Sequence, residues 1–446
     1  MNARYERWRW RTFSVTWLVY ASYYLTRKSF SVAKVAFAND PTIALSRQQL
    51  GLIDSTFLST YSFGQFVFGP LADRFGARRI LLLGMVLSVV TAFGNGFART
   101  ATIFLMFAAV QGFAQSSGWT TNLKIMSAWF SLRERGRVLG WWCTHYTAGT
   151  AFAAPFAGWL MDLYGRTTII DNITTTTPLW PAAFWGPAAL LALVTPVMWF
   201  GLRDQPKDVG LMPIEEYHHE PATIEDDGDS TPATDEGTWQ LIREVLRSKN
   251  IWLLAVAYFP VKLARYSFDF WGMKYVEESL GTTAFTSAMT AAWMPIGGLV
   301  GVVASGYISD RFFQSRRAPV IILSLLATAA VLVIGELHIH NIWTMRVFFF
   351  FVGVFLYGPD SLLSGTAAID FGTKRGAGTA IGFVNGIGSL GAVLGGYLPG
   401  VVTTSSDWSE FFTISLVGLL SSAAILVPLW KIYPHESSAR TSGEPE

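Results

Sequence analysis

Long apolar segments recur along the chain, and they are divided by short polar connections. A helix needs about 20 mostly apolar residues to cross a bilayer, so each segment predicts one transmembrane helix. The pattern predicts about twelve spans, near residues 12–35, 49–72, 79–98, 102–130, 138–163, 180–202, 251–276, 285–309, 318–337, 342–369, 378–401 and 409–432.

One long polar stretch, at residues 203–249, separates the first six predicted spans from the last six. Its acidic run at 225–229 is too hydrophilic to bury, which indicates a flexible cytoplasmic linker. The sequence therefore predicts an all-α membrane protein with two pseudo-symmetric six-helix bundles, at residues 1–202 and 250–446.

Composition agrees with this prediction and excludes several classes of protein. Hydrophobic residues make up 51% of the chain and charged residues only 14%, against about 25% charged in soluble domains. The net charge of +2 gives no reason to expect nucleic acid, and the single cysteine, Cys143, excludes an internal disulfide and a thiolate metal cluster. The sequence shows no nucleophile–base pair, metal-ligand spacing or Walker lysine loop. We therefore expect neither an enzyme nor a metal, a cofactor or ATP drive.

Lys and Arg are concentrated in alternate connections, which predicts the orientation of the chain. The basic start leads into the first span without a small-residue cleavage site, so we expect a retained helix and not a signal peptide. Both termini are predicted to be cytoplasmic, in a cell inner (plasma) membrane. The residues on the predicted cytoplasmic side are Arg4, Arg7, Arg9, Arg11, Arg74, Arg78, Arg79, Arg133, Arg135, Arg137, Arg311, Arg316, Arg317, Lys374, Arg375 and Lys431. The opposite side offers Arg47, Arg99 and Arg166.

A short motif occurs once in each predicted half, between spans two and three and between spans eight and nine. An offset of 237 residues relates its two copies, which are Gly69, Asp73 and Arg74, and Gly306, Asp310 and Arg311. We expect the glycines to allow close helix packing, and the Asp and Arg side chains to latch the loop to a neighbouring helix end. The alternative is that these basic loops merely set the topology. A repeat that pairs the two halves is typical of transporters with alternating access.

Ionisable residues inside predicted spans are costly and mark functional sites. Span one and span seven each carry a set at i, i+4 and i+7, which is one helical face. The sets are Tyr20, Tyr24 and Arg27, and Tyr258, Lys262 and Arg265. We expect the two arginines to face each other across a central cavity. Because guanidinium forks match phosphate oxygens, an organic phosphate is the favoured ligand.

The alternative is that structural acids neutralise the arginines. Asp269 lies four residues after Arg265 and could do so, whereas no equivalent acid is evident near Arg27. Asp360 interrupts the apolar run of span ten. It could accept a proton, contact a cationic group or pair with Lys262 or Arg265, and pairing is the preferred interpretation.

Two further residues in the spans have a simple structural interpretation. His145 in span five could donate to a phosphate, or it could be a hydrogen-bonded packing histidine. Asp54 in span two is expected near the outer surface, in contact with solvent.

The run from Tyr20 to Phe30 resembles the first-helix signature of the organophosphate:phosphate antiporters, a branch of the major facilitator superfamily. That branch includes glycerol-3-phosphate and hexose-phosphate transporters and a transporter-like hexose-phosphate sensor. The repeated loop motif is similar to the signature loop of the superfamily. The resemblance implies that Arg27 and Arg265 clamp the substrate phosphate and that His145 assists. It also implies that Tyr20, Tyr24 and Tyr266 line the cavity.

The chain departs from the family pattern in its charges. Gln65 stands where the family usually has a lysine, and Lys262 stands where several members have a tyrosine. Our hypothesis is that a positive charge has moved from span two to span seven. Asp269 is followed by Phe270 and then Trp271, whereas the family tends to have Asp directly before Trp.

Three functions remain open from the sequence. The favoured one is a secondary transporter, expected to be a monomer, that exchanges a sugar phosphate or glycerol-3-phosphate for inorganic phosphate by alternating access. The second is a membrane sensor of external sugar phosphate with a histidine kinase partner. The third is a proton-coupled organic anion symporter with Asp360 as proton carrier.

Overall fold

The computed structural model describes most of the predicted spans and connections. It covers residues 3–37, 40, 43, 45–131, 134, 138–139, 141–170, 173–218, 243, 245–365, 367, 377–404 and 407–432. Most of the predicted linker, residues 219–242, lies outside the described residues, as do Arg133, Arg135, Arg137, Lys374 and Arg375.

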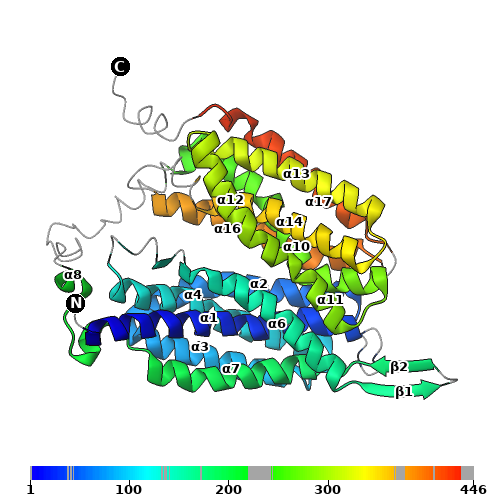
Figure 1. Ribbon diagram of the computed structural model, residues 1–446, viewed down its shortest axis with the longest axis horizontal. Helices are drawn as coiled ribbons and strands as arrows, with labels where there is room; N and C mark the ends of the chain where they lie inside the picture. The colour runs from blue at the N-terminus through cyan, green and yellow to red at the C-terminus, as the bar shows by residue number, and fades with distance from the viewer. Residues whose placement is uncertain are drawn as a thin grey trace. The chain divides into compact units, whose positions relative to one another are not determined.

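Helices coincide with all twelve predicted spans, which confirms the all-α membrane fold (Figure 1). The helices of the first six spans are α1 (Ala3–Phe37), α2 (Arg47–Phe75), α3 (Ala77–Asn95), α4 (Ala101–Trp129), α6 (Thr144–Leu163) and α7 (Ala182–Gly201). Those of the last six are α10 (Lys249–Leu280), α11 (Ala284–Ala291) with α12 (Trp293–Phe312), α13 (Arg317–His338), α14 (Ile342–Ser364), α16 (Ala377–Val402) and α17 (Ser409–Leu426). The remaining elements are η1 (Pro206–Val209), α8 (Ile214–Tyr217) and η2 (Val427–Leu429).

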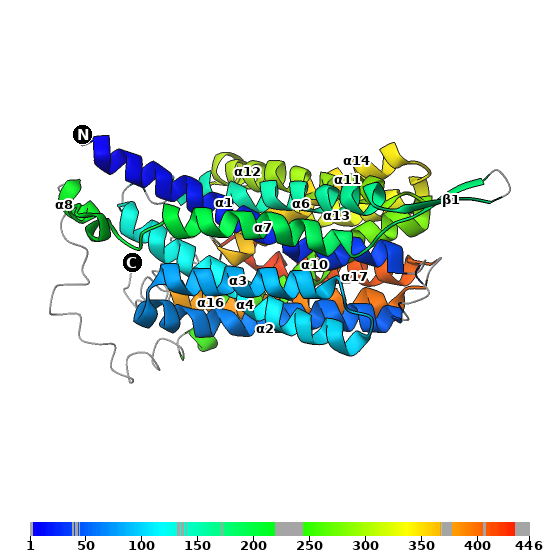
Figure 2. The ribbon, with the colours of Figure 1, turned by 90° about the horizontal axis from the view of Figure 1, so that it is seen from below.

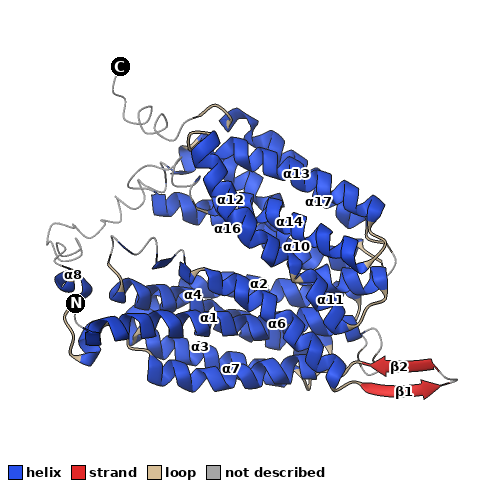
Figure 3. Ribbon diagram, in the orientation of Figure 1, coloured by secondary structure: helices blue, strands red, loops and turns tan. Residues whose placement is uncertain are grey.

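A β-hairpin between α6 and α7 was not part of the sequence prediction (Figure 3). Its strands are β1 (Arg166–Ile170) and β2 (Ile173–Thr177), which pair antiparallel with Arg166 opposite Thr177. The segment is rich in threonine and isoleucine, whose branched β-carbons favour extended backbone. This β-branched composition was the feature of the sequence that could have indicated the hairpin.

Seven helical segments within the described residues are long and apolar enough to cross a membrane by length and composition alone. They are Ala77–Asn95, Ala182–Gly201, Ala284–Phe312, Arg317–His338, Ile342–Ser364, Ala380–Val402 and Ser409–Leu429. Helices α1 and α10 are absent from this set because both carry several charged residues within their length. The two helices that carry the predicted ligand-binding arginines are thus the most highly charged of the described long helices.

The chain divides into two compact units that use the same helix pairings. The first unit comprises Met1–Asp229 with Gly281–Ala292, and the second comprises Ser230–Leu280 with Trp293–Glu446. In the first, α1 packs on α6 and α7, α2 on α4, and α3 on α4 and α7. In the second, α10 packs on α16 and α17, α12 on α14, and α13 on α14 and α17. This matched packing confirms the pseudo-symmetry that the sequence repeat predicts.

Glycines bring the helices that carry the two arginines close to their neighbours. A Cβ added to Gly149 on α6 would lie 2.7 Å from Ala21 O on α1, and one added to Gly395 on α16 would lie 2.5 Å from Leu263 O on α10. A Cβ on Gly388 would lie 2.5 Å from the Tyr258 ring. Only glycine fits such approaches, so α6 and α16 set the positions of α1 and α10 through backbone contact.

The start of the predicted linker is folded onto α1 instead of being a flexible tether. Residues 203–218 contain η1 and α8, and Figure 2 shows α8 close to the first turns of α1. Arg4 Nη2 donates to Val209 O at 2.8 Å, and Tyr5 Oη donates to Met212 O at 3.0 Å. The ring of Tyr5 stacks on that of Tyr217 with 4.0 Å between centroids. Sequence polarity missed this because the contacts join residues about 200 positions apart.

Candidate functional site

Arg27 is held in the first unit by a neutral amide and aromatic rings. Its Nε donates to Gln115 Oε1 on α4 at 3.0 Å, and Gln115 Nε2 donates in turn to Thr26 Oγ1 at 2.9 Å. The guanidinium carbon lies 4.6 Å from the centre of the Tyr24 ring and 4.8 Å from that of Tyr61. Aromatic faces attract a guanidinium without neutralising it, so these ring contacts orient the arginine.

His145 and Tyr20 form a buried aromatic group next to this arginine. The His145 ring is fully buried, with its centroid 4.3 Å from that of Tyr20 and 4.2 Å from that of Trp142. Its Nδ1 lies 2.5 Å from Trp142 O, so this nitrogen carries the proton and donates. Nε2 is buried and has no hydrogen-bond partner among the described residues. The histidine is packed and hydrogen-bonded, and its contribution to ligand binding stays a prediction.

Arg265 in the second unit is paired with an acid. Its Nη1 donates to Asp360 Oδ2 on α14 in an ion pair, and Tyr258 Oη donates to Asp360 Oδ1 at 3.0 Å. The side chains of Arg265 and Asp360 are only 17% and 11% exposed. In the structure, Asp360 is therefore the partner of Arg265.

The other predicted residues of the second unit surround this pair. Asp269, the acid first considered for Arg265, instead accepts a hydrogen bond from Tyr357 Oη at 3.5 Å. The Arg265 guanidinium lies over the rings of Tyr357 and Tyr266, at 4.2 and 5.6 Å from their centroids. Lys262 Nζ lies 4.9 Å from the centre of the Tyr258 ring. Lys262, Arg265, Tyr266 and Asp269 thus share one cluster, and Asp360 joins it from α14.

In the second unit, Asp310 of the loop motif contacts the start of the next helix. Arg317, the first residue of α13, donates from Nη1 to Asp310 Oδ1 at 2.6 Å and to Ser309 Oγ at 3.0 Å. Arg311 is exposed. The close packing expected at Gly306 is absent in this structure, since an added Cβ would meet no atom of the described residues within 4 Å.

In the first unit, an acid from outside the loop motif contacts the start of the next helix. Gly69 and Asp73 lie in the last turns of α2, and Arg74 is exposed. The surroundings of Gly69 and the Asp73 side chain fall outside the described part of the chain. Asp204 Oδ1, from beyond α7, accepts the backbone N–H of Arg78 at 2.7 Å. It thereby caps the start of α3, where a carboxylate is favoured by the helix dipole. Burial raises the pKa of the Asp204 carboxyl above its ordinary value.

The chain turns into α3 at Gly76, whose φ of +87° lies in the region that favours glycine. A Cβ there would lie 2.9 Å from Asp204 Oδ2, so a side chain at this position would also disturb the cap.

Asp54 corrects the expectation of a solvated acid near the surface. It forms an ion pair with Lys34, and their side chains are 1% and 0% exposed. Lys34 lies near the end of α1 and Asp54 near the start of α2, so the pair joins two successive helices inside the first unit. The prediction failed because it considered only the position of Asp54 along its span. It did not consider that a buried carboxylate can be stabilised by a cation from a neighbouring helix.

Sequence reasoning also missed Gln115, Tyr61 and Tyr357 as neighbours of the arginines. None of the three is among the residues predicted for the site. The available signal was polarity within apolar spans, since a buried amide or hydroxyl needs a partner.

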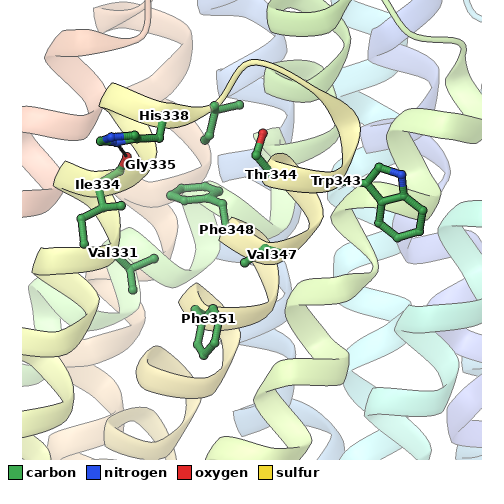
Figure 4. A pocket seen from close by; sticks show the side chains of 10 residues that line it. Val331, Ile334, Gly335, His338, Trp343, Thr344, Val347, Phe348 and Phe351 are labelled. Atoms are coloured by element: carbon green, nitrogen blue, oxygen red, sulfur yellow. Dashed lines mark hydrogen bonds between the residues drawn. The ribbon is translucent and has the colours of Figure 1, made fainter.

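A separate pocket lies between α13 and α14, near the turn that joins them (Figure 4). Its lining is almost entirely apolar, and none of the predicted site residues contributes to it. It is lined by Val331, Ile334, Gly335, His338, Ile339, Trp343, Thr344, Val347, Phe348 and Phe351. No Lys or Arg side chain lines it, so its chemistry does not suit a phosphate.

Comparison with known proteins places these observations in a family. The sequence profile of the Major Facilitator Superfamily matches residues 16–358 and 296–446. The chain is 30% identical to a "Probable hexose phosphate transport protein" of Chlamydia pneumoniae, over 96% of this chain and 93% of that protein. It is also 30% identical to the "Membrane sensor protein UhpC" of Escherichia coli (strain K12), with the same two coverages.

A solved structure with the same fold is that of a bacterial homologue of the human lysosomal transporter Spinster, in an inward-facing and unoccupied conformation. It has a TM-score of 0.69 and 17% identity, and the match covers 96% of this chain and 97% of that one. Family and fold together indicate a multi-pass membrane transporter and not an enzyme. The chain belongs to the major facilitator superfamily, and its relatives lie in the branch that its first helix resembles.

Proposed function

We propose that this protein is a secondary transporter that exchanges a sugar phosphate or glycerol-3-phosphate for inorganic phosphate by alternating access. The observation that carries the proposal is the pair of arginines at equivalent positions of α1 and α10. Each is oriented by a polar side chain from the equivalent partner helix, Gln115 on α4 or Asp360 on α14. The relative named as a probable hexose phosphate transport protein supports this class of substrate.

The proposal assigns roles to the predicted site residues. Arg27 and Arg265 bind the phosphate, since guanidinium groups offer paired donors to its oxygens. Lys262 adds positive charge, and His145 assists the binding. Tyr20, Tyr24 and Tyr266 provide ring surface and hydroxyl groups for the organic part.

The proposal also includes the arrangement of the chain. Residues 1–202 and 250–446 form the two halves, joined through 203–249. The repeated loops at Gly69–Arg74 and Gly306–Arg311 act during the conformational change. Both termini are cytoplasmic and the protein works as a monomer in the cell inner membrane.

The test is uptake of labelled inorganic phosphate into proteoliposomes preloaded with phosphate. The wild type should exchange phosphate, and Arg27→Lys and Arg265→Lys should each lose most of the exchange because a lysine cannot bind bidentately. Arg99→Lys is the matched control, since Arg99 Nη1 bonds the backbone oxygen of Ala98 at 2.9 Å. Competition by unlabelled glycerol phosphate and hexose phosphates then identifies the substrate. Absence of exchange in correctly inserted wild-type protein would contradict the proposal.

A sensor is the second candidate, because one relative at 30% identity is named a membrane sensor protein. A sensor would bind labelled sugar phosphate without accumulating it inside the vesicles. Proton-coupled symport, with Asp360 as the proton carrier, is the third candidate. A protonophore would inhibit such transport in the absence of counter-phosphate.

A further inference from the structure

Asp360 supplies Arg265 with a counter-anion that belongs to the protein itself. One carboxylate oxygen receives the Arg265 Nη1 hydrogen bond and the other receives the Tyr258 hydroxyl at 3.0 Å. Arg265 Nε is buried and has no hydrogen-bond partner among the described residues. The guanidinium therefore has an acid on one side and an unsatisfied donor on the other.

The matching arginine of the first unit contacts an amide on the corresponding helix. There Arg27 donates to the neutral side-chain oxygen of Gln115, from the helix that corresponds to α14. An anion that approaches Arg27 replaces a neutral acceptor. An anion that approaches Arg265 competes with a carboxylate, which binds a guanidinium with similar geometry. The two arginines therefore differ in what a ligand must displace.

We propose that Asp360 is an internal counter-anion that pairs with Arg265 in the empty protein and yields it to the phosphate of the substrate. The inference rests on the proposed function. A buried guanidinium without a partner is costly in the membrane interior, so the pairing stabilises the unliganded state. It also lowers the apparent affinity for phosphate, since part of the binding energy is used to separate the pair.

Lys262 gives the displaced carboxylate another cation. It lies one turn before Arg265 on α10, and its ammonium group packs against the ring of Tyr258, the residue that also holds Asp360. Gly388 on α16 leaves room for this side chain, because a Cβ there would lie 3.2 Å from Lys262 Cδ. Asp360 can thus exchange Arg265 for Lys262 without losing a positive partner.

The experiment measures thermal stabilisation of the purified full-length protein by inorganic phosphate, in wild type and in Asp360→Asn. We expect the apparent Kd for phosphate to fall about ten-fold in Asp360→Asn, because the competitor is removed. Glu277→Gln is the matched control: Glu277 also lies on α10, where it accepts from Lys274 Nζ at 2.8 Å, and this variant should leave the Kd within about two-fold. A merely structural role for Asp360 predicts the opposite sign, since damage to the site weakens binding.

Net efflux of phosphate from loaded vesicles into phosphate-free medium gives a second readout. Efflux requires the empty protein to change conformation, so it should be slower in Asp360→Asn, while phosphate:phosphate exchange is kept. The double variant Lys262→Gln with Asp360→Asn should bind phosphate no more weakly than Lys262→Gln alone.

Each result separates the inference from the proposed function. A wild type that phosphate neither stabilises nor exchanges contradicts the function. A wild type that binds phosphate, with an Asp360→Asn variant whose Kd is unchanged or higher, contradicts the inference alone. So does an Asp360→Asn variant that cannot be purified even in phosphate, because the anion should then replace the missing carboxylate.

Discussion

The guanidinium of Arg27 and the side-chain amide of Gln115 lie 3.0 Å apart, with the arginine Nε as donor and the amide oxygen as acceptor. Gln115 is itself fixed by its bond to Thr26 on the helix of Arg27. Arg27 thus has a fixed direction. At this contact an incoming anion competes with a neutral amide, whereas at the Arg265–Asp360 contact it competes with a carboxylate.

Gln115→Glu should convert this arginine into one with its own counter-anion. We expect the apparent Kd for phosphate to rise about ten-fold, because the new carboxylate competes for the guanidinium. Gln115→Leu is the control, since it removes the hydrogen bonds of the Gln115 side chain without adding charge. It should weaken phosphate binding less than Gln115→Glu does. Titration of phosphate against thermal stability measures both. Equal affinities in the two variants would show that charge at this position does not matter.

The buried pair of Lys34 and Asp54 should contribute strongly to the stability of the first unit. Asp54→Asn leaves a buried ammonium without its carboxylate, and we expect a loss of about 3–5 kcal/mol. Asp310→Asn breaks an ion pair whose acid is 61% exposed, and we expect a loss below about 1 kcal/mol. Unfolding in detergent, followed by tryptophan fluorescence, provides the comparison. Similar losses in both variants would argue against a special role for burial.

Gly395 should tolerate no side chain, because α16 approaches α10 through it. A Cβ there would lie 2.5 Å from Leu263 O and 3.2 Å from Ser267 N. Gly395→Ala should therefore destabilise the second unit by about 1–3 kcal/mol. Gly386→Ala, on the same helix with no atom within 4 Å of its added Cβ, should be neutral or slightly stabilising, since alanine is the better helix former. The melting temperatures of the two variants, each compared with the wild type, test this prediction. A Gly395→Ala variant as stable as Gly386→Ala would contradict it.

The raised pKa of Asp204 predicts how its contribution to stability depends on pH. A carboxyl whose pKa is higher in the folded than in the unfolded state stabilises the protein at low pH, and this contribution is lost as the pH rises through the folded pKa. The wild type should therefore gain stability relative to Asp204→Asn as the pH falls from neutral toward about 4. Melting temperatures across this range test the sign. A wild type that loses stability relative to the variant would contradict it.

Much of the fold followed from hydrophobic patterning, because bilayer thickness fixes the length of a span. The offset of 237 residues between Asp73 and Asp310 also indicated two matching halves before any helix packing was known. The hairpin at Arg166–Thr177 and the docked segment at residues 203–218 were missed. Both depend on contacts that a polar composition does not reveal.

The candidate site was predicted in part. The arginines and the pairing of Asp360 could be proposed, because charges inside an apolar span are rare and need partners. The choice of Asp360 over Asp269 for Arg265 could not, since a helix places i+4 neighbours together but says nothing of the helix packed beside it. The burial of Asp54 was hidden for the same reason. Pairing across helices is set by packing, which a linear pattern does not contain.

The contact between Arg4 and Val209 has a consequence for biogenesis. These residues are separated by 205 positions, and at a synthesis rate of about 5–20 residues per second the ribosome needs about ten to forty seconds to make the intervening chain. Helix α1 must therefore wait for the sixth span to be made before its leading end can dock. During that interval the basic, aromatic leading end of α1 lacks the contact that holds it in the folded unit.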